Sequence, residues 1–189
     1  MLIRLSEPSG LPVSVADLKE RIRVTHSDHD GTLEKLVRSE TRRYEDFTGR
    51  MMAPIDLEYR TGGWCEPILL PTAPIRAVTA VGYLDADHAE QTLDSGDWYF
   101  EASAEGGGVF FTSAFSSPTL SDRENPVRVM FSAGYDEPDV SGSGDDPELN
   151  APERDVTNII MMVQRIYDRD EQMEDDEMRR IFGHRRIFR

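Results

Sequence analysis

Apolar residues follow a helical spacing in two parts of the chain. Near the N-terminus, Val15, Leu18 and Ile22 fall on one face of a short helix, and Ser14 is placed to cap its first turn. A longer helix should begin near Asp28 or Thr32 and end at Gly49, where glycine favours a left-handed cap. The apolar face of this longer helix, with the helical period of about 3.6 residues, consists of Leu33, Leu36, Val37, Tyr44 and Phe47.

A second stretch with this spacing follows Pro152, which suits the first turn of a helix. Its apolar stripe is similar to that of the longer N-terminal helix, so we expect the two to pack together. The helical bundle is therefore predicted to comprise residues 14–50 and 150–172. The stripe consists of Val156, Ile159, Ile160, Val163, Ile166 and Tyr167.

Between these helices the pattern changes to an alternation of apolar and polar residues. It is clearest at Ile55, Leu57 and Tyr59, and it returns in short runs up to Phe131. No helical crossover lies between the runs, so the strands should be antiparallel. The predicted fold class is α+β: a helical bundle, a β insertion over 54–133 forming an antiparallel sheet or small sandwich, and an extended C-terminal tail.

Three further segments complete the predicted organisation. Residues 1–13 form an N-terminal arm in which Leu2, Ile3 and Leu5 alternate as in an edge strand. Residues 134–149 are rich in Gly, Ser, Pro and Asp, a composition typical of a flexible surface loop. Residues 173–189 form the C-terminal tail, acidic at first and then rich in arginine.

The charge balance limits the possible functions. The 189 residues include 21 Lys and Arg against 36 Asp and Glu, a formal net charge of -15. Nucleic-acid binding depends on neutralising phosphates, so tight DNA binding is not expected. A single cysteine, Cys65, excludes an internal disulfide framework. No apolar run approaches the roughly twenty residues of a membrane span, and the first residues are too polar for a signal peptide. We expect a soluble chain made in a cytoplasm, with no membrane partner.

The turn between the first two helices has the residue types of a metal site. His26, Asp28, His29 and Asp30 lie close in sequence, but neighbours in a short turn mostly point apart. The turn also resembles the start of a calcium loop, although Ser39 stands where that loop needs a bidentate Glu. Helix capping is the preferred interpretation, and no metal is predicted.

Other candidate reactive groups have structural explanations. Cys65 has no histidine near it in sequence to activate a thiolate. Gly106, Gly107 and Gly108 precede an apparent strand and lack the following Lys and Ser or Thr of a phosphate-binding loop. No catalytic residue, cofactor or cofactor-binding residue is predicted, and the chain is not expected to be an enzyme.

The arginine-rich end of the chain is predicted to bind a partner protein. Arginines interleaved with large apolar residues combine forked donors with apolar anchors, a composition typical of protein interfaces. Two alternatives stay open: the segment folds back on its own acidic helix, or its arginines contact nucleic acid. The predicted partner-binding residues are Arg179, Arg180, Ile181, Phe182, Arg185, Arg186, Ile187 and Phe188.

A second predicted interface lies in the β insertion. Its aromatic residues exceed what one thin sheet can bury on one face, so some should contact neighbouring subunits or another component. These residues are Trp98, Tyr99, Phe100, Phe110 and Phe111.

Several short sequences, in this order and spacing, resemble the head-tail connector family of tailed bacteriophages and phage-like gene transfer agents, also called adaptor or head-completion proteins. The resemblance covers residues 13 to about 170 and includes no catalytic motif. The sequences that carry it are Asp17-Leu18-Lys19, Thr48-Gly49-Arg50, Leu70-Pro71-x-x-Pro74-Ile75, Val81-x-Tyr83 and Ala133-Gly134-Tyr135.

The resemblance implies a helical bundle with inserted strands and a structural function. A ring of twelve subunits would join the portal protein of a DNA-filled capsid to the tail, at the head-tail junction of a virion or phage-like particle assembled in a bacterial cytoplasm. The implied partners are the portal, for which the arginine-rich segment is the predicted contact, a tail-side connector or terminator protein, and other copies of this chain. DNA would pass through without tight binding. The alternatives are a DNA-packaging accessory protein that binds nucleic acid, and a small metal-dependent hydrolase.

Overall fold

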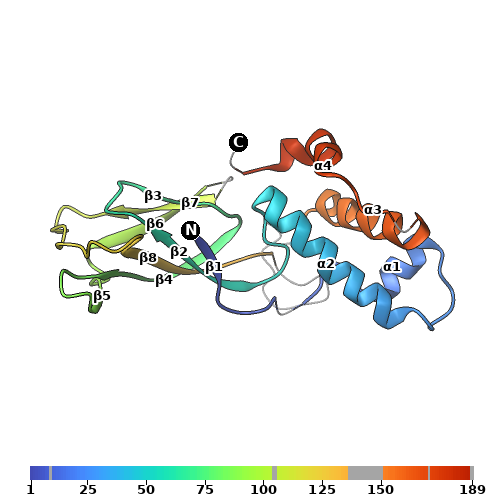
Figure 1. Ribbon diagram of the computed structural model, residues 1–189, viewed down its shortest axis with the longest axis horizontal. Helices are drawn as coiled ribbons and strands as arrows, with labels where there is room; N and C mark the ends of the chain where they lie inside the picture. The colour runs from blue at the N-terminus through green and yellow to red at the C-terminus, as the bar shows by residue number, and fades with distance from the viewer. Residues whose placement is uncertain (9, 104–105, 136–150, 170, 188–189) are drawn as a thin grey trace. The chain divides into compact units, whose positions relative to one another are not determined.

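The computed structural model describes residues 1–8, 10–103, 106–135, 151–169 and 171–187. The chain divides into two compact units (Figure 1). The β unit consists of Met1–Pro8 and Pro54–Gly134, and the helical unit consists of Ser9–Ala53 and Tyr135–Arg189. All the strands of the described chain lie in the β unit, and all its α-helices lie in the helical unit.

The helical unit contains the helices that the sequence predicts. Its elements are α1 (Val15–Ile22), α2 (Asp30–Thr48), α3 (Glu153–Arg169), α4 (Asp175–Phe182) and a short 3-10 helix, η2 (Gly183–Arg185). The Ser14 Oγ accepts a hydrogen bond from the Asp17 amide at 3.0 Å, so the predicted cap of α1 is confirmed. Gly49 ends α2 with a φ of 78°, the left-handed conformation that glycine adopts without strain.

The core of the helical unit forms where the apolar stripes of α1, α2 and α3 meet. Leu18 of α1, Leu33 and Val37 of α2, and Ile159 and Val163 of α3 are completely buried. They lie at the helical spacing in the sequence, which places them on one face of each helix. The amphipathic patterns therefore account for the packing of these three helices.

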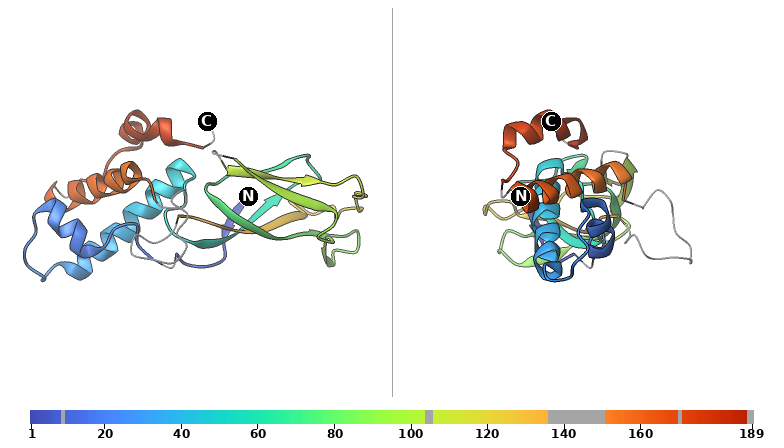
Figure 2. Two further views of the ribbon diagram at one scale, coloured as in Figure 1. Left: turned by 180° about the vertical axis from the view of Figure 1, so that it is seen from behind. Right: turned by 90° about the vertical axis from the view of Figure 1, so that its right-hand side faces the viewer.

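The β unit is a sandwich of two antiparallel sheets (Figure 2). The five-stranded sheet has the order β1-β2-β8-β4-β5, and the three-stranded sheet has the order β3-β7-β6. The predicted α+β fold, with an antiparallel insertion in a helical bundle, is confirmed. The strands are β1 (Leu2–Arg4), β2 (Ile55–Thr61), β3 (Ile68–Leu70), β4 (Ile75–Leu84), β5 (Glu90–Thr92), β6 (Trp98–Ser103), β7 (Gly106–Phe111) and β8 (Val127–Ala133).

Alternation along the strands builds the core of the β unit. In β8 every second residue is buried, and Val127, Val129 and Phe131 point inward. Leu57 of β2 pairs with Phe131, and Val109 of β7 supplies the opposite inner face. The N-terminal arm contributes β1, an edge strand that pairs with β2.

The C-terminal segment differs from the extended tail predicted for 173–189. Asp175–Phe182 forms α4, and Met178, Phe182 and Ile187 are buried in the helical unit. The physical reason is the spacing: Met178 and Phe182 lie four residues apart, on one face of a helix. The arginine-rich composition obscured this pattern. Most of the loop predicted at 134–149 lies outside the described residues.

Candidate functional site

The C-terminal segment packs against α2 through a few large side chains. The ring of Phe182 meets that of Tyr44 edge to face, with centroids 5.5 Å apart and planes at 74°. Both rings are completely buried. Such aromatic pairs stabilise by about 0.5–1.5 kcal/mol beyond the area they bury. Phe182 is thus an anchor of the helical unit's own core.

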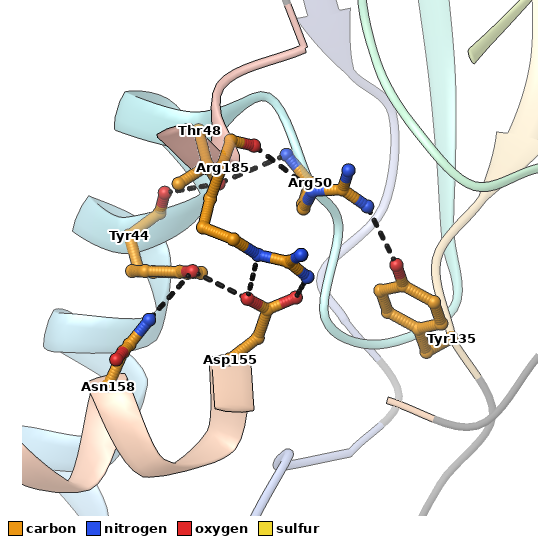
Figure 3. Close-up of polar contacts among 7 residues, drawn as sticks. All are labelled: Tyr44, Thr48, Arg50, Tyr135, Asp155, Asn158 and Arg185. Carbon is orange, nitrogen blue, oxygen red and sulfur yellow. Dashed lines mark hydrogen bonds and ion pairs between the residues drawn. The ribbon is translucent and has the colours of Figure 1, made fainter. Parts of the chain in front are cut away.

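The buried carboxylate of Asp155 also holds the C-terminal segment. Asp155, in the first turn of α3, has no exposed surface. Its Oδ1 accepts hydrogen bonds from Tyr44 Oη at 2.8 Å and from Arg185 Nε at 2.7 Å. Its Oδ2 accepts from Arg185 Nη2 at 2.5 Å (Figure 3). The Arg185 guanidinium therefore binds the Asp155 carboxylate with two hydrogen bonds, the bidentate geometry that makes such pairs strong.

The electrostatics follow from this burial. Desolvation is the main reason that the pKa of Tyr44 is raised, so its hydroxyl stays protonated and donates to Asp155. The hydrogen bond with Asp155 raises the pKa of Arg185, which keeps the guanidinium charged. Asn158 Nδ2 donates to Tyr44 Oη at 3.3 Å. The group is a closed polar network with its charges balanced.

Main-chain contacts complete the attachment of the segment. The Ile187 amide donates to the Thr48 carbonyl at 2.9 Å. Arg50 Nε donates to the Arg185 carbonyl at 3.1 Å, and its Nη1 donates to Tyr135 Oη at 3.1 Å (Figure 3). At the start of the segment, Arg43 donates to the Met173 carbonyl. The segment is thus held near both of its ends.

The predicted partner-binding residues of this segment fall into two groups. Phe182, Ile187 and the Arg185 guanidinium are occupied within the subunit. Arg179, Arg180 and Arg186 are exposed, and Ile181 is half-buried. Phe188 lies outside the described residues. Only the second group is exposed to a partner in this conformation. The first group does fold back on the subunit, but onto Tyr44 of α2 and Asp155 of α3 and not onto the acidic stretch before α4.

The predicted aromatic interface of the β insertion also divides in two. In β6 and β7, Trp98 is opposite Phe111 and Tyr99 is opposite Phe110. Side chains alternate across a strand, so Trp98, Phe100 and Phe111 point into the sandwich. Tyr99 and Phe110 point outward, where their rings stack with centroids 5.5 Å apart. Sequence reasoning placed all five together because it could not assign the faces.

The outward aromatics belong to a continuous apolar surface that we call the outer patch, formed by Pro67, Leu69, Tyr99 and Phe110. Its centre is Gly108, where a Cβ atom would lie 3.3 to 3.5 Å from Phe110, Pro67 and Leu69. Leu69 and Tyr99 are 56% and 45% exposed. Contiguous exposed apolar side chains of this kind mark interaction sites.

The described residues contain little that favours catalysis. No cluster of His, Cys, Asp and Glu in the described chain could hold a metal ion. His29 Nδ1 lies 2.9 Å from Tyr167 Oη, and Asp30 pairs with Lys19. The N-cap of α2 is His29, which makes no side-chain cap hydrogen bond, so the helix capping predicted for this turn is wrong. Cys65 is exposed. No helix of the described chain is long and apolar enough to cross a membrane.

Comparison with known proteins gives a match for the whole fold. A chain in the neck of an empty gene transfer agent particle, computed with C6 symmetry, superposes with a TM-score of 0.74 at 18% sequence identity. The comparison covers 100% of this chain and 96% of that chain. This protein therefore has the fold of a chain from a gene transfer agent neck. A chain from the native particle's neck, computed with C12 symmetry, gives a TM-score of 0.73 at 17% identity, with the same coverage.

A chain from the virion of the native gene transfer agent particle gives a TM-score of 0.73 at 18% identity, again covering 100% and 96% of the two chains. No protein-family model and no curated protein matches the sequence. At this identity the likeness shows the fold. It agrees with the fold that the resemblance to head-tail connectors implies.

The residues that sequence reasoning missed are polar groups within apolar surroundings. Asp155 and Asn158 were not predicted to have a role, and Tyr44 was predicted only as part of an apolar face. The available signal was the spacing of Asp155 and Asn158, three residues apart and next to the stripe that begins at Val156. That spacing turns two polar side chains toward the core.

Proposed function

We propose that this chain is the subunit of a ring in the neck of a phage-like particle, where it joins the portal of a DNA-filled capsid to the tail. The observation that carries the proposal is the likeness over the whole length of the chain to subunits of gene transfer agent necks, one of them computed with C12 symmetry. The proposed ring has twelve copies. The role is structural, without catalysis or cofactor.

The charge of the chain supports this role. With a net charge of -15 per subunit, a ring of copies presents a strongly negative surface. Such a surface repels phosphates and does not hold DNA that passes through the ring. A DNA-packaging factor that binds nucleic acid would need the opposite balance.

The proposed contact with the portal is the exposed side of α4 and η2. Arg179 and Arg180 of α4, and Arg186 directly after η2, are exposed, and a guanidinium can bind a carboxylate with two hydrogen bonds. Within the subunit, Arg179 lies 3.8 Å from Asp176, and the Arg186 guanidinium lies over the Phe47 ring, 5.2 Å from its centroid. Ile181 adds a half-buried apolar contact between them. The outer patch of the β unit is the proposed contact with neighbouring subunits or with a tail-side connector or terminator protein.

A complementation experiment tests the proposal. A strain that produces the particle, with its own copy of this gene deleted, receives an epitope-tagged chain, and particles are examined by electron microscopy with a label on the tag. We expect tail-less heads without the chain, and tailed particles labelled at the head-tail junction with it. Tailed particles in the deletion strain, or label elsewhere on the particle, would refute the proposal.

Charge reversal tests the portal contact in the same strain. The double variant Arg179→Glu, Arg180→Glu should lower attachment to portal-bearing heads by about tenfold or more, because two charge-assisted contacts become repulsive. The matched control is Arg154→Glu, an exposed arginine of α3, which should attach normally. Equal attachment of both variants would exclude this surface as the portal contact.

A further inference from the structure

A hollow of about 410 Å³ lies in the β unit. It is formed by the connection between β2 and β3 and by the chain that follows β7. Pockets of this size hold small molecules or single side chains of a partner. The walls carry three aromatic rings, several hydroxyl groups and one carboxylate, among them Trp64, Phe111, Phe115, Thr112, Ser117 and Glu66. We call this site the aromatic hollow.

The three rings form a rigid wall. The Trp64 ring meets Phe111 and Phe115 edge to face, with centroids 5.7 Å and 5.2 Å away. Phe111 and Phe115 stack on each other with centroids 4.1 Å apart. Trp64 Nε1 also donates a hydrogen bond to the Pro118 carbonyl at 3.0 Å, which fixes the rotation of the ring. The wall exists before any ligand binds, so binding does not have to order it.

Glu66 gives the aromatic hollow a negative charge. It is exposed, and it is the one charged residue among those that line the hollow. Its carboxylate has no hydrogen-bond or ion-pair partner among the described residues. The described residues of the β unit add to this charge, because they include five Arg and no Lys against twelve Asp and Glu. The hollow therefore attracts a cation and repels an anion.

The lining favours one kind of cation. A guanidinium group is planar, so it stacks on aromatic rings, and it carries five N–H donors in one plane. The hydroxyl oxygens of Ser113 and Ser117, which also line the hollow and are exposed, can accept from donors that the carboxylate does not reach. An alkylammonium is more strongly hydrated and has no flat face. A neutral ligand would leave the Glu66 carboxylate without a counter-charge.

We propose that the aromatic hollow binds an arginine side chain of a partner protein, with the guanidinium against the aromatic wall and paired with Glu66. The position of the hollow supports a protein as the source, because Glu66 directly precedes Pro67 of the outer patch. Arginine is enriched among the residues that contribute most to protein interfaces, and here it would bind next to a contiguous apolar surface. That the partner is a protein of the neck rests on the proposed function, whereas the affinity for a guanidinium group does not.

The fluorescence of Trp64 tests the inference on the isolated chain. The variant Trp98→Phe leaves Trp64 as the only tryptophan, so the emission reports on the hollow. The probe is N-acetyl-arginine amide, and its matched control is N-acetyl-citrulline amide, which has nearly the same shape without the charge. We expect a saturable change in emission with the arginine probe, and binding of the citrulline probe that is weaker by about fivefold or more.

Two further variants identify the groups that bind the probe. In the Trp98→Phe chain, Glu66→Gln should weaken arginine binding by about fivefold, because it removes the charge and keeps the shape. Phe115→Leu should weaken it by a similar factor, because it removes one ring of the wall. The matched control is Glu7→Gln, an exposed acid of the same unit that does not line the hollow, and its affinity should be unchanged. Denaturant titration checks that Phe115→Leu folds; if it does not, Glu66→Gln decides.

Three results would overturn the inference. Equal binding of the arginine and citrulline probes would exclude a cation site. Unchanged arginine binding in Glu66→Gln would exclude the carboxylate as its partner. Tighter binding of putrescine, a free diamine, than of the arginine probe would indicate a site for small amines instead of a side chain.

A charge reversal tests the partner within particles. In the deletion strain, Glu66→Arg should lower the yield of tailed particles several-fold, whereas the matched control Glu7→Arg should leave it unchanged. A normal yield from a folded Glu66→Arg chain would show that no partner arginine fills the hollow, and it would leave the neck assignment intact. A parent chain that is missing from particles would instead refute the proposed function, and the fluorescence results would still decide the guanidinium site.

Discussion

Different interactions fix the positions of neighbouring strands in the β unit and of neighbouring helices in the helical unit. In the β unit, backbone ladders set the register of each strand, and the described buried polar residues are few: Glu58, Thr72 and Ser121. The helical unit buries Glu40, Thr41, Glu45, Thr48, Asp155 and Asn158. A helix satisfies its own backbone groups, so it has no ladder that fixes its position against a neighbour. Side-chain pairs such as Asp155 with Arg185 provide that position in the helical unit.

The two units can be followed separately in solution. Both tryptophans, Trp64 and Trp98, lie in the β unit, and the α-helices of the described chain lie in the helical unit. Tryptophan fluorescence therefore reports unfolding of the β unit, and far-ultraviolet circular dichroism reports mainly the helical unit. Denaturant titrations with both probes measure how each substitution affects each unit.

The largest effect is expected at the buried carboxylate. Asp155→Ala leaves the Arg185 guanidinium without its partner and the Tyr44 hydroxyl without its acceptor. Breaking a buried pair in this way costs about 3–5 kcal/mol. The free energy of unfolding measured by circular dichroism should fall by that amount, and the fluorescence transition should change much less.

The control for this substitution is Glu153→Ala in the same helical turn. The Glu153 side chain is 86% exposed, so its removal should change the free energy of unfolding by no more than about 0.5 kcal/mol. Similar changes in the two variants would show that the Asp155 network does not hold the C-terminal segment.

An intermediate effect is expected at the glycine that begins β7. Gly106 has a φ of 129°, and a Cβ atom there would lie 2.8 Å from the Thr72 carbonyl oxygen. A side chain at this position is strained, and the neighbouring backbone leaves it no space. Gly106→Ala should lower the free energy of unfolding of the β unit by about 1–3 kcal/mol, as measured by tryptophan fluorescence.

Gly62 provides the matched comparison, because a Cβ atom there would have nothing within 4 Å. Gly62→Ala should leave the fluorescence transition nearly unchanged. If Gly106→Ala also left the fluorescence transition unchanged, the close approach of β7 to the Thr72 carbonyl would not constrain the structure of the β unit.

The smallest effect is expected at an exposed ion pair of α2. Arg38 Nη2 lies 3.0 Å from Glu34 Oε1, and the side chains are 53% and 47% exposed. Solvent screens such pairs, so Glu34→Ala should lower the free energy of unfolding by less than about 0.5 kcal/mol, and added salt should remove even this difference. A loss comparable with that of Asp155→Ala would contradict the contrast between buried and exposed charge pairs.

Long amphipathic patterns and caps were predictable from the sequence. The Ser14 cap, the Gly49 cap and the apolar faces of α2 and α3 depend on residues close in sequence, so local spacing is enough to find them. The longer strands followed from alternation. β3 and β5 were not predicted, because three residues are too few to establish a period of two.

The candidate site was only partly predictable, because it depends on contacts between distant residues. Asp155 and Arg185 are 30 residues apart, and Tyr44 and Asp155 are 111 apart. No local pattern relates them. The exposed and inward aromatics of β6 and β7 could not be separated either, since the sequence does not show which face of the strand covers the core.

The division of the chain between the units sets an order of folding during synthesis. The chain enters the β unit, leaves it after Pro8, returns at Pro54 and leaves again after Gly134. The ribosome has therefore supplied the whole β unit before α3 and α4 exist. Until then α1 and α2 have no partner for Leu33 and Val37, whose apolar surface is a target for chaperones or aggregation. The segment after Ala151 is thus the last part of the chain that the helical unit needs in order to fold. If synthesis stalls before this segment, the nascent chain should contain a folded β sandwich and an incompletely folded helical unit.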